Sequence, residues 1–204
     1  SATVTTSAAP QVAGNVLDGD TLDGTAVQAG DVSISVVDNP SNSSALSLDS
    51  NTAEVSVAAD TAPGTYTLEY QVCERNATSN CDTATITVHV SAGTIEAADD
   101  SVTLVSSAQE QAAGNVLDGD TLADAAADAN NVTISATDNA GNSPALSLDP
   151  ATGELTLAPG TQAGIHTLEY RICEINAPSN CDTATATVYV SAGEIAAAND
   201  SETV

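Results

Sequence analysis

The stretch that decides the fold is GTYTLEYQVCERNATSNCDTATITVHV, at residues 64–90. Apolar and polar side chains alternate with a period of two up to Cys73 and again after Cys81, which is typical of half-buried β-strands. The ERNATSN between the cysteines forms the predicted tip of a hairpin. We expect eight side chains of the two strands to point into a core: Tyr66, Leu68, Tyr70, Val72, Ala84, Ile86, Val88 and Val90.

The two cysteines of this hairpin share its outward face, because Cys73 alternates in step with Glu69 and Cys81 with Thr83. A disulfide across neighbouring strands requires this placement. Zinc binding and a redox pair are the alternatives, but zinc normally takes four ligands at closer spacing. The sequence therefore predicts the local disulfides Cys73–Cys81 and Cys173–Cys181, and with them an oxidising compartment.

The whole pattern occurs twice. A shift of 100 residues aligns the two halves without a gap, so that AGNVLDGDTL at 13–22 returns at 113–122. A third copy begins near the end, because AADDSVTL at 97–104 is echoed by AANDSETV at 197–204. These repeats predict three segments: a domain at 1–97, a second at 98–197, and the start of a third repeat or a terminal joining strand at 198–204.

Other segments of each copy also alternate with a period of two, and turn residues such as Asp38-Asn39-Pro40 separate them. No segment shows a sustained helical period. The further strands expected in the first copy are near Thr3–Thr6, near Asn15–Leu17, at 32–36, around Leu46 and Leu48, and at 54–57. The predicted fold class is therefore all-β: two tandem immunoglobulin-like sandwiches of about seven strands each.

The composition limits which residue types can fill the core and which kinds of partner the chain can bind. Phe, Trp and Met are absent, so Val, Leu, Ile and Ala must fill each core. There are 28 acidic residues against Arg75 and Arg171, a formal net charge of −26. Such a charge repels nucleic acid and anionic membranes, whose phosphates need Lys and Arg partners. No stretch approaches the apolar length of a membrane span.

Acidic residues recur in Asp-Gly-Asp turns and at the repeat junctions. Hard cations such as calcium prefer several carboxylate and carbonyl oxygens, which these positions offer at a joint between domains. Ordinary turn chemistry and solvated linker carboxylates are the alternative. The candidate structural calcium ligands are Asp18, Asp20, Asp99, Asp100, Asp118, Asp120 and Asp200.

No enzyme is expected. The two histidines do not match between the copies: His89 aligns with Tyr189, and His166 replaces Tyr66. A catalytic histidine should not exchange with tyrosine between near-identical units, and neither unit combines a nucleophile with a base. We therefore predict no catalytic residue.

The ordered landmarks AADDSVTL, AGNVLDGDTL, GTYTLEYQVCE, SNCDTAT and TVHV resemble the cadherin-like and bacterial immunoglobulin-like tandem repeats of large Gram-negative surface proteins. Those proteins include adhesins and gliding- or biofilm-related proteins. The resemblance implies an extracellular, rod-like array of repeats, with calcium at the joints in some relatives. The expected function is a rigid spacer whose partners are other copies of the repeat. The alternatives are a fibre subunit joined head to tail by a terminal strand, and a receptor- or glycan-binding module.

Overall fold

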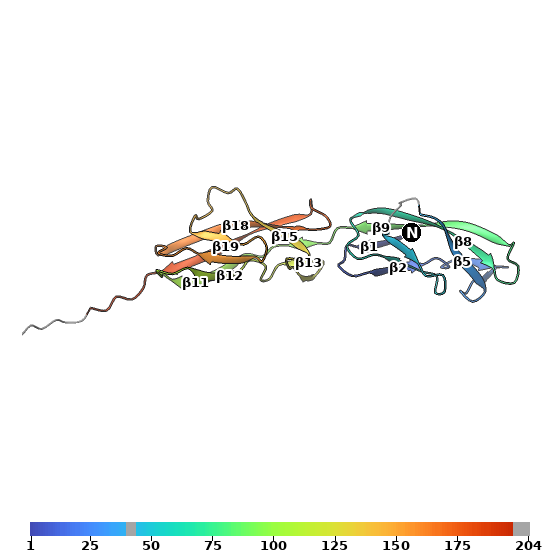
Figure 1. The fold of residues 1–204 in the computed structure, drawn as a ribbon, viewed down its shortest axis with the longest axis horizontal. Helices are drawn as coiled ribbons and strands as arrows, with labels where there is room; N and C mark the ends of the chain where they lie inside the picture. Colours follow the sequence, from blue (N-terminus) through green and yellow to red (C-terminus); the bar gives the residue numbers. More distant parts are fainter. Residues whose placement is uncertain (40–43, 198–204) are drawn as a thin grey trace, which may run out of the picture. The chain divides into compact units, whose positions relative to one another are not determined.

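The chain folds into two compact units of β-sheet, described by a computed structural model for residues 1–39 and 44–197 (Figure 1). Unit 1 comprises Ser1–Gly93 together with Asn176–Asn180, and unit 2 comprises Thr94–Ile175 and Cys181–Val204. The described residues contain strands, turns and coil, and no helix that is long and apolar enough to cross a membrane.

Unit 1 is a sandwich of a four-stranded and a three-stranded sheet, with one small ribbon beside them. The first sheet has the order β1 (Ala2–Thr5), β9 (Cys81–Ser91), β8 (Gly64–Glu74) and β5 (Val32–Asp38). The second sheet has the order β2 (Gln11–Asn15), β7 (Glu54–Val57) and β6 (Leu46–Leu48). The ribbon pairs β3 (Thr21–Leu22) with β4 (Thr25–Ala26).

Unit 2 repeats this arrangement and adds one strand to the ribbon. Its four-stranded sheet has the order β11 (Asp100–Val105), β19 (Cys181–Ser191), β18 (Gly164–Glu174) and β15 (Val132–Ala136). Its three-stranded sheet has the order β12 (Gln111–Asn115), β17 (Glu154–Leu157) and β16 (Leu146–Leu148). The ribbon has the order β10 (Ile95–Glu96), β13 (Thr121–Leu122) and β14 (Ala125–Ala126).

The predicted fold class is confirmed, because the two principal sheets of each unit together hold seven strands. Strand β1 runs parallel to β9, and β11 runs parallel to β19, while the other pairs are antiparallel. The expected strand at Asn15–Leu17 is wrong in its position. The strand ends at Asn15, because the Asn15 side chain accepts a hydrogen bond from the Leu17 amide and holds a turn there.

The central hairpin of the prediction is present as β8 and β9, paired from Gly64↔Val90 to Cys73↔Cys81. Leu68, Tyr70, Val88 and Val90 are buried, as the period of two requires. Ala84 is the exception: it was expected to point into the core, yet it is exposed, whereas its counterpart Ala184 is buried.

The cysteines meet as predicted. Cys73 and Cys81 are directly opposite partners on β8 and β9, and Cys173 and Cys181 occupy the same places on β18 and β19. Both pairs are disulfide-bonded, and no cysteine among the described residues is free. Each bond therefore ties two neighbouring strands at the end of one hairpin.

The boundary between the units lies four residues before the expected one. Residues 94–97 were assigned to the first domain, but Thr94 is the first residue of unit 2. The reason is physical: these residues pair with the ribbon of unit 2 and pack against its core. The segment expected to begin a third repeat, residues 198–204, lies outside the described residues.

Candidate functional site

The segment that leads into unit 2, residues 94–98, forms part of that unit's fold, and we call it the lead-in segment. Within it, β10 pairs with β13 in the register Ile95↔Leu122 and Glu96↔Thr121. The Ala123 amide also donates to the Thr94 carbonyl at 2.7 Å. The side chains of Ile95 and Ala97 pack against the core of unit 2. The lead-in segment therefore acts as an additional edge strand.

Carboxylates of unit 2 hold the residues that follow β10. Asp182 Oδ2 accepts a hydrogen bond from the Ala97 amide at 2.9 Å, and Asp120 Oδ1 accepts one from the Ala98 amide at 2.7 Å. Directly after the lead-in segment, Asp99 is itself the acceptor: its Oδ1 accepts a hydrogen bond from the Thr185 amide of β19 at 2.8 Å. Charged acceptors make stronger bonds to amides than neutral ones. The lead-in segment is thus fixed along most of its length.

A buried tyrosine, Tyr170, completes the site that holds the lead-in segment. We call this site, formed by Asp120, Asp182 and Tyr170, the seat. Tyr170 Oη lies 2.9 Å from the Ala98 carbonyl oxygen, 3.1 Å from Asp120 Oδ1 and 3.3 Å from Asp100 Oδ2. The hydroxyl donates its one proton to one of these acceptors at a time. Its pKa lies well above the usual value because of burial, followed by the negative charges of Asp120 and Asp100. The hydroxyl therefore stays protonated and available as a donor.

The two carboxylates beside this tyrosine are unfavourable as anions. Burial, followed by repulsion from Asp120, raises the pKa of Asp100 to about 6. Burial also raises the pKa of Asp120, although hydrogen bonds from Ala98 and Tyr170 oppose the shift. Asp120 is only 1% exposed. Asp100 and Asp120 are therefore acidic side chains placed next to the apolar core of unit 2, where ionisation is unfavourable.

Unit 1 has residues equivalent to those of the seat, namely Asp20, Tyr70 and Asp82. There the equivalent residues line an open groove of about 400 Å³, which we call the unit 1 groove. Its walls come from the ribbon and the residues beside it, from β5, β8 and β9, and they include Asp20, Thr21, Leu22, Val27, Val32, Tyr70, Val72, Asp82, Thr83 and Ala84. Five of these positions have counterparts 100 places later that contact the lead-in segment: Asp120, Thr121, Leu122, Tyr170 and Asp182.

Hydrogen bonding in the unit 1 groove differs accordingly. Tyr70 Oη donates to the Val16 carbonyl at 2.9 Å, whereas Tyr170 bonds the lead-in segment. Within residues 1–39 and 44–197, no group donates a hydrogen bond to the Asp20 carboxylate. Partial burial, followed by the charge of Asp82, raises the pKa of Asp20. The groove therefore presents the carboxylates of Asp20 and Asp82, whose counterparts Asp120 and Asp182 accept hydrogen bonds from backbone amides of the lead-in segment.

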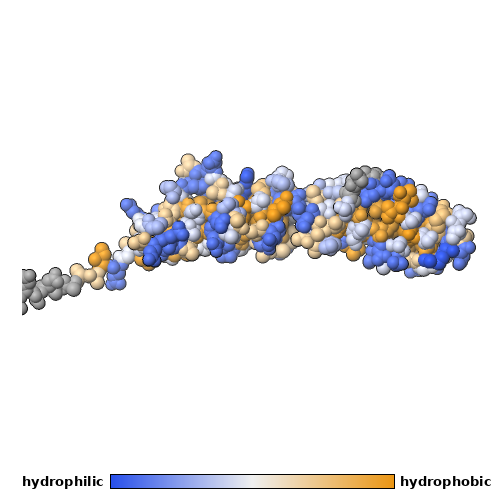
Figure 2. Space-filling model, in the orientation of Figure 1, coloured by the Kyte–Doolittle hydropathy of each residue, from blue (hydrophilic) through white to orange (hydrophobic). Residues whose placement is uncertain are grey.

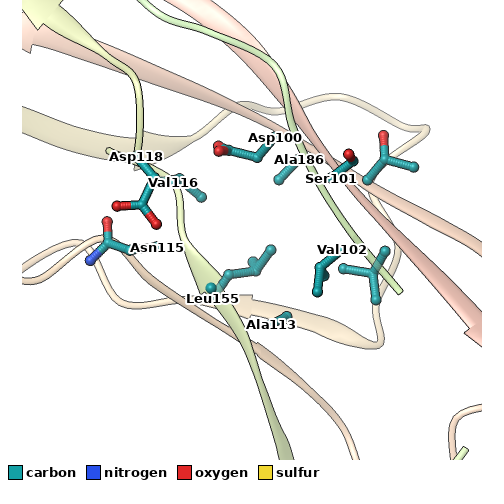
Figure 3. Close-up of a pocket in the computed structure, with 12 residues that line it drawn as sticks. Asp100, Ser101, Val102, Ala113, Asn115, Val116, Asp118, Leu155 and Ala186 are labelled. Carbon is teal, nitrogen blue, oxygen red and sulfur yellow. The ribbon is translucent and has the colours of Figure 1, made fainter. Parts of the chain in front are cut away.

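A second cavity, of about 190 Å³, lies in unit 2 between β11 and β12 (Figure 3). Asp100 and Asp118 lie at one end of it, beside Asn115, and Val102, Ala113 and Leu155 line the other end (Figure 3). The amide of Asn115 is already engaged, because it accepts from Leu117 and donates to Thr152. The cavity thus brings together two of the candidate calcium ligands.

The remaining candidate ligands lie as follows. Asp99 and Asp120 use carboxylate oxygens to accept backbone hydrogen bonds, Asp18 is exposed on its turn, and Asp20 lies in the unit 1 groove. Asp200 lies outside the described residues. In the part of the chain that the structure describes, no group of three or more His, Cys, Asp or Glu side chains is arranged to hold a metal ion. Calcium at these carboxylates stays a prediction.

Sequence reasoning missed two kinds of residue in the seat. Tyr70 was assigned only to the core, and with it its counterpart Tyr170, while Asp182 was given no role. In the structure both Tyr170 and Asp182 bind the lead-in segment. The signal was present, since TLEY and SNCDTAT are unchanged between the two copies. A buried tyrosine needs a partner for its hydroxyl, which was a reason to look for one.

Comparisons with known proteins identify no family. No protein-family model matches the chain, and no curated protein matches it. Among solved structures, mouse cadherin-23 repeats 22–24 align at 16% identity over 95% of this chain and 63% of that one, with a TM-score of 0.38. Drosophila N-cadherin repeats 1–4 align at 11% identity over 93% and 47%, with a TM-score of 0.37. A SusE-like surface polysaccharide-binding protein of Bacteroides thetaiotaomicron aligns at 16% identity over 78% and 24%, with a TM-score of 0.35. The chain thus spans less than two thirds of each of these structures.

Proposed function

We propose that this chain is a structural module of an extracellular surface protein or fibre, in which β-sandwich repeats are joined in series as a rigid spacer. The observation that carries the proposal is the lead-in segment: the residues that connect the repeats are part of the second sandwich. A spacer needs connections of this kind, because its function is reach and stiffness.

The length of the connection supports stiffness. Strand β9 ends at Ser91 and β10 begins at Ile95, so only residues 92–94 lie between the two strands. Beyond them, Ala97 and Ala98 are held by carboxylates of unit 2. Few backbone torsions remain to bend such a joint, whereas a long linker would behave as a flexible coil.

Chemistry favours an extracellular setting for this module. Two disulfides in one chain are typical of secreted proteins, because cytosolic reductants keep thiols reduced. Blue, hydrophilic residues cover much of the surface (Figure 2). The net charge of −26 makes neighbouring copies of the chain repel one another electrostatically. We infer a role without catalysis, with other copies of the repeat as partners.

The spacer proposal can be tested by measuring whether the two repeats tumble as one body. Residual dipolar couplings of the ¹⁵N-labelled chain should fit a single alignment tensor for both units. An insertion of six Gly and Ser residues between Gly93 and Thr94 should give two tensors, because it frees the joint. The same insertion in the exposed turn between Gln109 and Glu110 is the matched control. Two independent tensors in the unchanged chain would refute the proposal.

A further inference from the structure

We infer that the cavity between β11 and β12 of unit 2 binds a primary alkylammonium group, supplied by a free amine or by a lysine side chain. In this arrangement the carboxylates of Asp100 and Asp118 hold the ammonium, and apolar side chains at the other end contact the alkyl chain. The inference is independent of the proposed spacer function, because it concerns a site within one sandwich and not the connection between repeats.

The cavity lies where an edge strand of one sheet faces an edge strand of the other. β11 is at the edge of the four-stranded sheet and β12 at the edge of the three-stranded sheet. Strand β12 bulges here, because its register with β17 shifts between Ala112 and Asn115 and the φ of Gly114 is +107°. A Cβ at Gly114 would meet no atom within 4 Å. The bulge therefore leaves open space beside the cavity of about 190 Å³.

One end of the cavity is acidic, because Asp100 and Asp118 lie there (Figure 3). The two carboxylates are close enough to interact: after burial and the charge of Asp120, the charge of Asp118 also raises the pKa of Asp100. Within residues 1–39 and 44–197, no hydrogen bond or ion pair reaches the Asp118 carboxylate, and the Tyr170 hydroxyl is the one partner of the Asp100 carboxylate, at 3.3 Å. A cation placed between these carboxylates replaces their repulsion with attraction.

Lysine and arginine of this chain do not supply that cation. The sequence has no lysine and two arginines. Arg75 belongs to unit 1, where it donates hydrogen bonds to the carbonyls of Gly30 and Val32. Arg171 lies on β18, which β19 separates from β11. A cation at the acidic end of the cavity therefore comes from outside residues 1–204.

The other end of the cavity is apolar. Val102, Ala113 and Leu155 line it, and Ala186 also contributes to the lining (Figure 3). The equivalent of Ala186 in unit 1 is Ile86, which packs against the core there, so the smaller side chain leaves space in unit 2. The volume is below the roughly 300–1,000 Å³ of sites for drug-sized ligands. It therefore suits an alkyl chain of a few carbons.

The two ends together favour an alkylammonium over a bare metal ion. Calcium takes about six to eight oxygen ligands. Among the described residues, no group of three or more His, Cys, Asp or Glu side chains is arranged to hold a metal ion, and the Asn115 amide already bonds Leu117 and Thr152. A metal ion would also leave the apolar end unfilled, whereas an alkyl chain fills it and leaves water in doing so, which is favourable.

The test titrates the full ¹⁵N-labelled chain with methylammonium, propylammonium and pentylammonium chloride at constant ionic strength. Each added methylene should lower the dissociation constant about fourfold, because it moves from water to the apolar end. Chemical shift changes should centre on the amides of Val102 and Ala113. An acidic surface without a cavity would bind the three amines equally, so the dependence on chain length is the decisive measurement.

Two substitutions separate the acidic end from the apolar end. Asp118→Asn, at an exposed position, should weaken pentylammonium binding about fivefold. Asp18→Asn makes the same change at the equivalent exposed position of unit 1, and as the matched control it should leave binding unchanged. Ala186→Ile introduces the side chain that unit 1 has at this position, so pentylammonium should then bind no better than methylammonium.

Ala186 is buried, so the dispersion of the amide spectrum checks that Ala186→Ile is folded. If it is not, the chain-length series and the exposed pair Asp118→Asn and Asp18→Asn decide the question without it.

A peptide pair identifies the source of the ammonium. An acetylated and amidated Gly-Lys-Gly peptide is compared with the same peptide carrying norleucine in place of lysine. If the lysine peptide shifts the same amides as pentylammonium, a lysine side chain reaches the cavity. If the free amines alone do so, the cavity takes small amines. Both outcomes support the alkylammonium site.

Three results would overturn the inference. The first is an equal affinity for the three amines, and the second is an equal effect of Asp118→Asn and Asp18→Asn. The third comes from calcium chloride as a separate probe: if calcium shifts the amides around the cavity and the amines do not, the cavity holds a metal ion instead. The dipolar couplings that test the spacer are measured without amine, so either proposal can fail while the other stands.

Discussion

Units 1 and 2 share a sequence pattern and a strand order, yet they differ at one edge. In unit 2, Ala184 is buried, and the lead-in segment accepts a hydrogen bond from the Tyr170 hydroxyl and donates its Ala98 and Ala97 amides to Asp120 and Asp182. In unit 1 the same positions form an open groove, and the tyrosine hydroxyl turns to the Val16 carbonyl. The comparison teaches that the folded unit is offset from the sequence repeat, because the second sandwich includes residues 94–98, which precede its first long strand, β11.

A second difference concerns backbone strain. Five turn positions adopt a left-handed conformation in both copies, and at three of them only one copy has glycine: Gly24 and Asp124, Ala53 and Gly153, Asp60 and Gly160. Aspartate tolerates this conformation better than alanine does. Ala53 and Gly153 are therefore the pair in which the two copies differ most in the conformational strain of the backbone.

The largest effect is expected from removing the carboxylate of the seat. Asp120→Ala should lower the free energy of unfolding of unit 2 by about 2 kcal/mol, because the Ala98 amide loses its charged acceptor in a buried site. Asp20→Ala should change unit 1 by less than about 0.5 kcal/mol, since no described group donates to that carboxylate. Amide hydrogen exchange, read separately for each unit, measures both. Equal losses in the two units would contradict the role given to the lead-in segment.

An intermediate effect is expected at the strained turn. Gly153→Ala should destabilise unit 2 by about 1 kcal/mol, because φ is +79° there and an added Cβ would lie 2.5 Å from Asn115 Oδ1. The reverse change, Ala53→Gly, should be close to neutral, since relief at a φ of 64° is offset by loss of a fully buried methyl group. Urea unfolding of both variants tests the pair. A clear gain from Ala53→Gly would show that the methyl group contributes little.

The smallest effect is expected from pH. The folded-state pKa of Asp100, about 6, exceeds its usual 3.8, so between these values the folded unit binds more protons than the unfolded chain. Unit 2 should therefore become more stable as pH falls from 7 towards 5, and this contribution should disappear as pH rises through 6. Asp100→Asn should flatten this part of the pH profile, measured as melting temperature. An unchanged profile would remove Asp100 as its source.

Much of the fold could be predicted because it depends on local pattern. The period of two around Leu68 and Val88 predicted the strands, and the parity of Cys73 and Cys81 predicted their disulfide. The seat was harder to predict, because Tyr170, Asp120 and Ala98 are far apart in sequence and meet only through sheet pairing. The placement of Ala84 failed for the same reason, since alternation tells which face a residue occupies but not whether anything covers that face.

The sequence by itself determined that this chain is two copies of one β-sandwich, each clamped by a disulfide at the end of its last hairpin. Those features follow from side-chain alternation, turn residues and spacing, which act over a few residues. Only the tertiary structure decided that residues 94–98 belong to the second sandwich and that the matching edge of unit 1 is lined by Asp20, Tyr70 and Asp82. The physical reason is that burial and backbone capping depend on which distant strand edges meet, and folding alone brings those edges together.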